Sequence, residues 1–456
     1  MSHQESKVLR VESLARVEGQ GALHLRLQDG EVTEARLKIY EPPRFFEAFL
    51  RGRSYTEPPD ITSRVCGICP VAYQMSACRA IEDACGIAVD GQLAALRRLL
   101  YCGEWIESQT LHIYLLHAPD FLGADSVIDL ARTHRAHVER GLALKRTGNA
   151  LMELLGGRAI HPINVRLGGF HSVPTKAELR PLAERLKRAR EDAEATVRWV
   201  AGFDFPDVGL DNELFALAEP GTYAIHSGVP TAMAAPGTAG LPADSDRALP
   251  TRTFPLHEFP DHVVETQVPH STGLHSRLDG NRHLTGTLAR YAISGRWLPV
   301  EVLQAAQEAG LGDPREGAVC RNPFRSIIVR AIEVRYAVGE ALRLIDAYEP
   351  PPRPYVDVPA RAGTGHGATE APRGLLYHRY TLDTEGTVSE AALVPPTAQN
   401  QAAIEQDLRR AVQERLDARP AATDAELTAL CERTIRNHDP CISCATHFLD
   451  LTVTRD

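Results

Sequence analysis

The chain has 456 residues, 43% of them hydrophobic, so it is long enough to bury a large core as one domain or a few tightly packed ones. Its formal charge of −9 and the lack of a lysine- or arginine-rich run argue against nucleic acid or an anionic membrane surface as a partner. No apolar run reaches the roughly 18 residues of a membrane-spanning helix, and the N-terminus MSHQESKVLR lacks the apolar core of a secretory signal, so we expect a cytoplasmic protein without membrane insertion.

Periodic patterns in the sequence predict one hairpin near the N-terminus and three long helices. Hydrophobic and polar residues alternate from Gly21 to Ile39 and break at Asp29-Gly30, which predicts a β-hairpin. Leucine, isoleucine and other apolar residues recur at helical spacing in three stretches, which predicts long core helices. These stretches are residues 91–117, 176–202 and 324–348.

Two segments rich in proline, glycine and aspartate, residues 205–262 and 349–373, show no sustained periodicity and are predicted to be loops. Alternation from Tyr377 to Val394 predicts a second hairpin, and a helix is expected over residues 398–418. Because we find neither an internal repeat nor a clear linker, we predict one integrated α+β domain over residues 1–456, predominantly α, with long core helices and peripheral hairpins.

Two C-x-x-C pairs lie near opposite ends of the chain, Cys66 and Cys69 in RVCGICP and Cys441 and Cys444 in DPCISCATH. Each such turn brings two sulfurs to one side of the backbone, so the two pairs together could supply four thiolates to a metal. Structural zinc sites usually separate their pairs by about 15–20 residues, and a thioredoxin-like site needs a single pair in a βαβ unit. Spacing alone leaves zinc, an iron–sulfur cluster or another thiolate-bound metal open.

The residues around these cysteines resemble the two signature motifs of nickel–iron hydrogenase large subunits. Further segments resemble the family in the same order: RVEG at 16–19, FFEAF at 45–49, HPINVRLGGF at 161–170, APRG at 371–374 and VPPT at 394–397. The resemblance implies the fold of that family and its activity, the reversible heterolytic cleavage of dihydrogen. It also implies that the electrons leave to iron–sulfur clusters on a separate small subunit, because no further cysteine group here could hold one.

The family pattern implies a role for each motif cysteine. All four would bind nickel, and Cys69 and Cys444 would also bridge to an iron that carries one carbon monoxide and two cyanides, Fe(CN)2CO. Cys66 and Cys441 would be terminal nickel ligands. Soft, electron-rich thiolates suit nickel and low-spin iron better than hard cations.

Three polar residues are assigned to the same centre by resemblance. Arg373, in APRG, matches the arginine over the open metal position, and Asp439 matches the acidic residue that helps to hold it. Glu18, in RVEG, matches the glutamate that takes protons from a terminal cysteine, by implication Cys441. Without these motifs the arginine would be interpreted as a surface residue and the glutamate as a solvated side chain beside a strand.

A second ion is also implied by resemblance. Glu47 matches the glutamate that binds a buried magnesium-like ion, with His447 as a second ligand and the backbone carbonyl of Leu393 as a third. Oxygen ligands and water fit Mg²⁺, and the histidine also allows Fe²⁺ or zinc.

The remaining cysteines match no ligand position in the family and are interpreted as buried structural thiols: Cys78, Cys85, Cys102, Cys320 and Cys431. Four histidines could serve a proton route, but satisfied core histidines are the favoured interpretation: His112, His117, His161 and His171.

The sequence departs from the family at Tyr73 and Gln20, where many members have histidine. Its CGICPVAYQMSA segment is most similar to the cytoplasmic, sulfhydrogenase-like branch that exchanges electrons with NAD(P). Because no glycine-rich dinucleotide motif follows a strand, we expect flavin and NAD(P) on partner diaphorase subunits. A hydrogen-sensing regulatory subunit, a quinone-site subunit related to respiratory NADH dehydrogenase and a zinc-binding structural protein are the alternatives.

Nine residues, Phe448 to Asp456, follow His447. In most of the family a maturation endopeptidase cuts after this histidine, so we expect a mature chain of residues 1–447. The alternating Phe448 to Val453 segment would also suit an uncleaved C-terminal strand.

Overall fold

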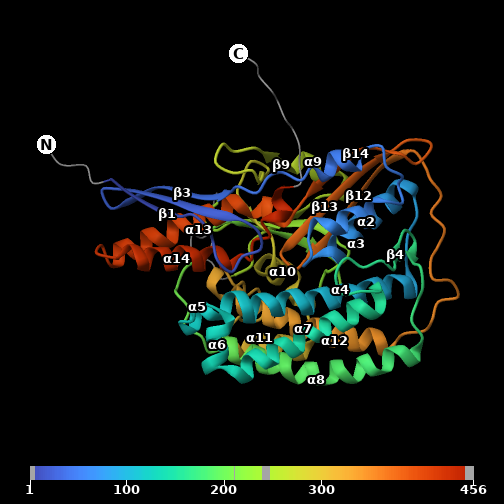
Figure 1. Ribbon diagram of the computed structural model, residues 1–456, viewed down its shortest axis with the longest axis horizontal. Coiled ribbons are helices and arrows are strands. Elements are labelled where there is room, and N and C mark those ends of the chain that lie inside the picture. Colours follow the sequence, from blue (N-terminus) through green and yellow to red (C-terminus); the bar gives the residue numbers. More distant parts are fainter. Residues whose placement is uncertain (1–5, 210, 239–246, 447–456) are drawn as a thin grey trace, which may run out of the picture.

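The computed structural model describes residues 6–209, 211–238 and 247–446. Long helices fill one half of the molecule, and most strands lie in the other half with α3, α13 and α14 (Figure 1). The predicted α+β class, predominantly α, is confirmed. No helix in the described part of the chain is both long enough and apolar enough to cross a membrane.

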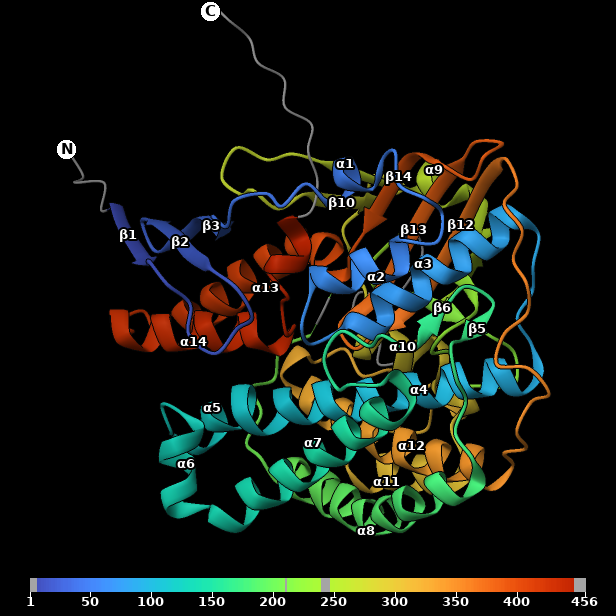
Figure 2. The ribbon, with the colours of Figure 1, turned by 45° about the vertical axis from the view of Figure 1, so that its right-hand side comes forward.

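The helical half is built from four long helices that pack side by side (Figure 2). They are α4 (Gly91–Leu111), α7 (Arg135–Gly156), α8 (Lys176–Ala201) and α12 (Ser326–Asp346). Three of them confirm the predicted helices, and the predicted 91–117 segment ends in a π-helical turn, His112–His117. This turn continues into α5 (Ala118–Leu122).

Strands from the N-terminal part of the chain and helices from its C-terminal part meet in a second unit. Strands β1 (Ser6–Val11), β2 (Gly21–Gln28) and β3 (Glu31–Ile39) form an antiparallel sheet that packs on α13 (Pro396–Ala418) and α14 (Asp424–Asn437), as both ribbon views show. The predicted hairpin and C-terminal helix are confirmed. Positive φ angles at Asp29 (50°) and Gly30 (85°) give the turn the twist that adjacent antiparallel strands need.

A third unit places the sheet β12 (Gly363–Ala371), β13 (Gly374–Leu382) and β14 (Val388–Val394) against α3 (Pro70–Cys85). The predicted hairpin over 377–394 is confirmed, but the loop predicted over 349–373 is wrong because β12 occupies its second half. A Cβ added to Gly365 would lie 2.0 Å from the Ala80 carbonyl oxygen. Glycine therefore lets strand and helix backbones touch, which explains the high glycine content that suggested a loop.

The loop predicted over 205–262 is also wrong. It contains β6 (Glu213–Ala218), β7 (Val229–Met233) and β8 (Thr251–Thr253), which join β11 (His283–Leu284) in the order β11-β6-β7-β8. Strand β6 is buried along nearly its whole length, so both of its faces are covered by other parts of the chain. A strand covered on both sides lacks the alternation by which strands are recognised in sequence.

The other helices and strands are short. They are α1 (Phe46–Leu50), α2 (Pro58–Thr62), α6 (Val127–Thr133), β4 (Val165–Arg166), β5 (Gly169–Phe170), α9 (Phe259–His262), β9 (Val263–Thr266), β10 (His275–Leu278), α10 (Thr287–Ser294) and α11 (Val300–Glu308). Single turns of 3-10 helix are η1 (Ser63–Val65), η3 (Leu256–Glu258), η4 (Gly295–Trp297), η5 (Pro314–Glu316), η6 (Pro323–Arg325) and η7 (Ser443–Thr446).

Candidate metal centre

The first cysteine pair lies in the turn between η1 and α3. Cys66 and Cys69 are each 3% exposed, and the backbone N–H of Ile68 donates to the Cys66 sulfur at 3.3 Å. Cys69 directly precedes α3, whose first residue is Pro70. Proline is favoured at this helix position, so the sequence itself starts the helix at the second cysteine.

Glu104 of α4 anchors that helix start, and sequence reasoning missed it. Its fully buried carboxylate accepts hydrogen bonds from the backbone N–H groups of Val71 (2.6 Å) and Ala72 (3.1 Å). These donors have no partner within a helix, so the carboxylate satisfies them and suits the positive end of the helix dipole. Burial nevertheless raises the pKa of Glu104 well above its usual range. Its helical spacing from Leu96 and Leu100 was a signal that it faces the core.

The second cysteine pair is tied to the N-terminal part of the chain. The backbone N–H of Cys441 donates to Thr397 Oγ1 at 2.9 Å, and the backbone N–H of Ile442 donates to the Glu18 carbonyl oxygen at 3.0 Å. A Cβ added to Gly19 would lie 2.7 Å from the Cβ of Ile442, and Gly19 has a φ of +88°. Contacts with the second cysteine pair therefore explain the glycine in the RVEG segment and the threonine in the VPPT segment.

The four sulfurs converge on one small volume. All lie within 4.8 Å of one another, with 3.5 Å between Cys66 and Cys441 and 3.8 Å between Cys69 and Cys444. Thiolates at about 2.3 Å from one tetrahedral ion would lie roughly 3.8 Å apart, so the spacing suits a shared metal. All four side chains are almost fully buried.

The structure joins Cys441 and Cys444 in a disulfide, whereas Cys66 and Cys69 are free thiols. The predicted set of four thiolates therefore applies to the chain in which this bond is reduced. A hydrogen bond with Cys69 lowers the pKa of Cys66, and the same contact together with burial raises the pKa of Cys69. Cys66 is thus the more readily ionised thiol of the first pair.

Glu18 faces the second pair as predicted by resemblance. Its Oε2 atom lies 3.1 Å from the Cys441 sulfur, within hydrogen-bond reach of the Cys441 thiol in the reduced form, and accepts a hydrogen bond from the backbone N–H of Ser443 at 3.1 Å. The carboxylate is half-buried, between the closed sulfur cluster and the exterior. A carboxyl group at this distance from a thiol can exchange a proton with it.

Arg373 lies in the turn between β12 and β13 and is clamped by Asp439. Its Nε donates to the Asp439 carbonyl oxygen at 2.9 Å and its Nη2 to Oδ1 at 3.1 Å, while Nη1 is buried without a hydrogen-bond partner. Burial opposes the charge, but Asp439 and the Cys69 and Cys66 sulfurs outweigh it and raise the pKa of Arg373. The residue therefore stays cationic beside the cysteines.

Asp439 is held in an unusual backbone conformation. Its φ is +49°, a region that costs most non-glycine residues energy but that aspartate tolerates better than most. Arg330 of α12 lies 3.6 Å from Oδ2, so Asp439 stands between two guanidinium groups. Burial lowers the pKa of Arg330 to about 10. Arg330 belongs to the arrangement and carried no signal in the sequence beyond a cation within a predicted core helix.

Comparisons with known proteins agree with this geometry. Residues 44–140 and 345–447 match the model of a family described as nickel-dependent hydrogenase. The chain is 34% identical to sulfhydrogenase 1 subunit alpha of Pyrococcus furiosus over 97% of this chain and 98% of that protein. It is 27% identical to the NAD-reducing hydrogenase HoxS subunit beta of Cupriavidus necator over 97% of this chain and 95% of that protein.

The chain belongs to the nickel-dependent hydrogenase family. A solved NAD⁺-reducing [NiFe]-hydrogenase in the H2-reduced state has the same fold, with a TM-score of 0.85, 26% identity, and coverage of 97% of this chain and 99% of that one. The resemblance found in the sequence motifs is thereby confirmed.

Two of the three residues predicted to hold a second ion lie within the described part of the chain. Glu47 Oε1 accepts a hydrogen bond from the backbone N–H of Leu393 at 2.7 Å, so the two predicted ligand residues lie side by side. His447 and the tail to Asp456 lie outside the described residues, so their ion-binding and processing roles stay predictions. Glu265 approaches Glu47, and burial followed by the Glu47 charge raises the pKa of Glu265 well above its usual range.

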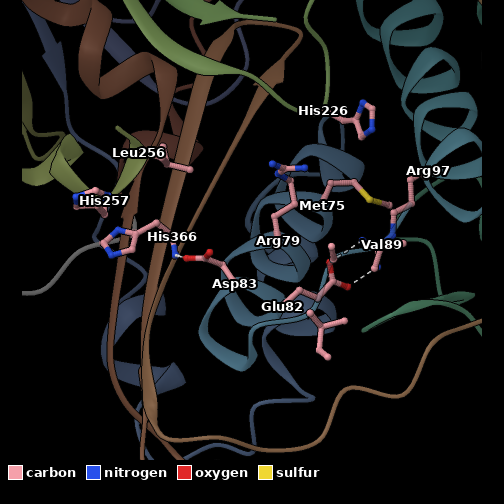
Figure 3. Close-up of a pocket in the computed structure, with 13 residues that line it drawn as sticks. Met75, Arg79, Glu82, Asp83, Val89, Arg97, His226, Leu256, His257 and His366 are labelled. Atoms are coloured by element: carbon pink, nitrogen blue, oxygen red, sulfur yellow. Dashed lines mark hydrogen bonds and ion pairs between the residues drawn. The ribbon is translucent and has the colours of Figure 1, made fainter. Parts of the chain in front are cut away.

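A cavity of about 360 Å³ lies farther along α3 and is separate from the metal centre (Figure 3). None of the described residues that line it is a cysteine. Glu82 is paired with Arg97 at 2.6 and 2.8 Å, and Asp83 accepts a hydrogen bond from the backbone N–H of His366 at 2.9 Å. Its acidic side chains thus already have protein partners, and the sulfur cluster lies in another, closed part of the core.

The cysteines outside the cluster are all buried free thiols, as interpreted from the sequence. Burial raises the pKa of Cys78, Cys102 and Cys431 to about 12, which keeps them protonated and unreactive.

Proposed function

We propose that this large subunit catalyses the reversible heterolytic cleavage of dihydrogen and passes the electrons to an iron–sulfur small subunit and on to NAD(P). One observation carries the proposal. Four buried cysteine sulfurs lie within 4.8 Å of one another, beside a buried arginine with one guanidinium nitrogen that has no hydrogen-bond partner. Soft sulfur ligands beside a fixed guanidinium group suit a redox metal centre. A structural zinc site needs no such positively charged side chain.

The residues of the cluster fit a nickel–iron centre with an Fe(CN)2CO unit. In the proposal Cys66 and Cys441 would bind nickel alone, and Cys69 and Cys444 would bind both nickel and iron. Such a centre, when bound, supplies the polarisation and electron uptake that split dihydrogen. The protein supplies the thiolates, excludes water through their burial and removes the proton.

Glu18 is the proposed proton acceptor. Its Oε2 lies 3.1 Å from the Cys441 sulfur, so a proton on that sulfur has a carboxylate within hydrogen-bond reach. The backbone N–H of Ser443 holds the same oxygen in place. Asp439 fixes the positive charge of Arg373 beside the sulfurs by accepting hydrogen bonds from Nε and Nη2. The third nitrogen, Nη1, takes no part in this contact.

Infrared spectroscopy of the purified complex tests the cofactor class directly. Bound carbon monoxide and cyanide absorb where protein does not, so we expect one carbonyl band and two cyanide bands from a preparation that contains nickel. A zinc-containing preparation with neither type of band would overturn the proposal and favour a structural metal site.

Arg373→Lys is expected to retain nickel and iron but to lower turnover by about 10²–10³-fold, the usual cost of losing one fixed electrostatic group. Lysine keeps the charge, but its flexible ammonium cannot reproduce a planar guanidinium clamped through two nitrogens by Asp439. Hydrogen uptake and metal content are the measurements. The exposed Arg64→Lys variant is the matched control, and unchanged turnover in Arg373→Lys would remove this arginine from the mechanism.

We further propose that Glu47, the Leu393 carbonyl and His447 bind Mg²⁺ or Fe²⁺. The Glu47–Leu393 hydrogen bond of 2.7 Å supports the first two ligands. Such an ion would tie the C-terminal segment, which a maturation endopeptidase trims after His447, to α1 and β14. The mature chain in this proposal is a single domain of residues 1–447.

The proposed partners are an iron–sulfur small subunit and diaphorase subunits that carry flavin and NAD(P). One relative is named as an NAD-reducing hydrogenase subunit and one structural neighbour as an NAD⁺-reducing enzyme, which supports this branch. Ile160 and Ile163 are 57% and 55% exposed, and a Cβ added to Gly67 in the first cysteine motif would lie 4.0 Å from Cγ2 of Ile160. Exposed isoleucines beside the centre suit an apolar contact with the electron-accepting subunit.

The double variant Ile160→Asp/Ile163→Asp should weaken association with the small subunit by at least about tenfold, because charge would replace the apolar contact. Co-purification and size-exclusion chromatography measure the loss. Ile128→Asp on α6, where the side chain is 69% exposed, is the control. A stable and fully active isolated chain would contradict the proposed partner.

A further inference from the structure

A second group of metal-binding side chains lies outside the cysteine cluster. It consists of His270 in the loop between β9 and β10, His275 at the start of β10 and Glu405 on α13. One possible ligand atom from each residue lies within 4.8 Å of the other two. His270 Nε2 lies 2.8 Å from Glu405 Oε1, and the two imidazole rings are nearly perpendicular with centroids 5.4 Å apart.

His275 is the member of this group that an ordinary ion pair does not explain. Its side chain is 4% exposed, and its Nε2 atom is buried without a hydrogen-bond partner. His270 and Glu405 would satisfy each other if they served only as a salt bridge. A buried nitrogen without a partner is costly, and a shared ion would give it one.

We propose that His270, His275 and Glu405 bind a single divalent ion of the zinc type. Two imidazoles and one carboxylate are a common three-ligand set for Zn²⁺, with water at the fourth position. Tetrahedral ligands at about 2.0–2.2 Å from zinc lie roughly 3.3–3.6 Å apart, so small side-chain rotations bring the three groups into place. Glu405 Oε1 also accepts the backbone N–H of Leu37 at 3.0 Å, a bond that helps to fix the orientation of the carboxylate.

The site is distinct from the one proposed around Glu47. Successive side chains of a strand point to opposite faces, so Ser276 points away from His275. Ser276 is instead paired with Glu265 across the β9–β10 ladder, and Glu265 approaches Glu47. Strand β10 thus separates the zinc-type site on the α13 side from the Glu47 site on the other side.

The ion would fasten a loop that packs directly behind the second cysteine motif. In that loop the backbone N–H of Thr272 donates to the Ile39 carbonyl oxygen at 2.9 Å. A Cβ added to Gly273 would lie 2.7 Å from Gln401 Nε2 and 3.3 Å from the Cβ of Ala445. Ala445 follows Cys444, so the ion would hold the loop between α13 and the segment that carries Cys441 and Cys444.

Zinc titration of the purified, nickel-loaded complex tests this proposal. We expect the parent complex to bind one Zn²⁺ per chain at this site, with nickel and iron contents unchanged, and its unfolding temperature to rise. His275→Gln should lower the zinc affinity by at least about a hundredfold, since loss of second-shell groups alone costs 10–100-fold. The control His257→Gln removes a histidine that is 69% exposed and should bind zinc as the parent does.

Glu405→Gln guards against a simple folding defect, because an amide oxygen can still accept the Leu37 N–H while it binds zinc poorly. This variant should fold, keep its infrared bands and lose the zinc equivalent. Zinc that displaces nickel at the cysteines would instead be accompanied by loss of nickel. Equal zinc binding by the parent, His275→Gln and Glu405→Gln, or no zinc equivalent in the parent, would overturn the proposed site while leaving the hydrogenase function untouched.

Discussion

Cys441→Ser and Cys66→Ser are each expected to abolish hydrogen activity, with a loss greater than about a hundredfold. Even second-shell residues of metal sites cost 10–100-fold when replaced, and these residues are proposed as direct ligands. A serine oxygen is harder than a thiolate and a poor nickel ligand, so metal content should fall together with activity. The two sulfurs lie 3.5 Å apart, so either loss opens the same side of the cluster.

Nickel analysis and hydrogen-uptake assays measure the outcome. The matched control is Cys85→Ser, which changes a buried free thiol at the C-terminal end of α3, outside the cluster, and should keep metal and activity. Full nickel content with near-normal activity in Cys441→Ser or Cys66→Ser would rule out the ligand assignment.

Glu18→Gln is expected to keep nickel and iron while slowing hydrogen–deuterium exchange by about 10²–10⁴-fold, the usual contribution of a positioned acid or base. Glutamine preserves the shape of the side chain and can still accept the Ser443 N–H, but an amide cannot carry the proton from Cys441. Metal binding and proton transfer are therefore separated in this variant. Isotope exchange measures the proton transfer, and metal analysis measures the nickel and iron content.

Glu41→Gln is the matched control for this experiment. Glu41 Oε1 accepts the Ser443 hydroxyl at 3.2 Å and the Gln20 N–H at 2.9 Å, so it packs on the same segment without a hydrogen bond to Cys441. We expect its exchange rate to stay near that of the parent. Parent-like exchange in Glu18→Gln would show that another group carries the proton.

Local patterns in the sequence predicted the elements whose residues carry their own signal. The Asp29-Gly30 turn, the apolar spacing of α4, α8 and α12 and the alternation over β13 and β14 depend on neighbours a few residues apart, so they can be recognised without the fold. The short spacing within each C-x-x-C pair likewise predicts two converging sulfurs. The motif series indicated the family, and with it the roles proposed for Glu18 and Arg373.

Only the tertiary structure decided how these local pieces meet. The two cysteine pairs meet across 375 residues, and the Glu18 carbonyl and the Thr397 hydroxyl hold the second pair in place, contacts that no local pattern encodes. Burial on both faces hid β6, and backbone contact with α3 made β12 resemble a loop. Glu104 can cap α3 only because α4 crosses the start of α3 and brings the carboxylate beside the free N–H groups there. Long-range packing thus determined which polar residues surround the sulfurs.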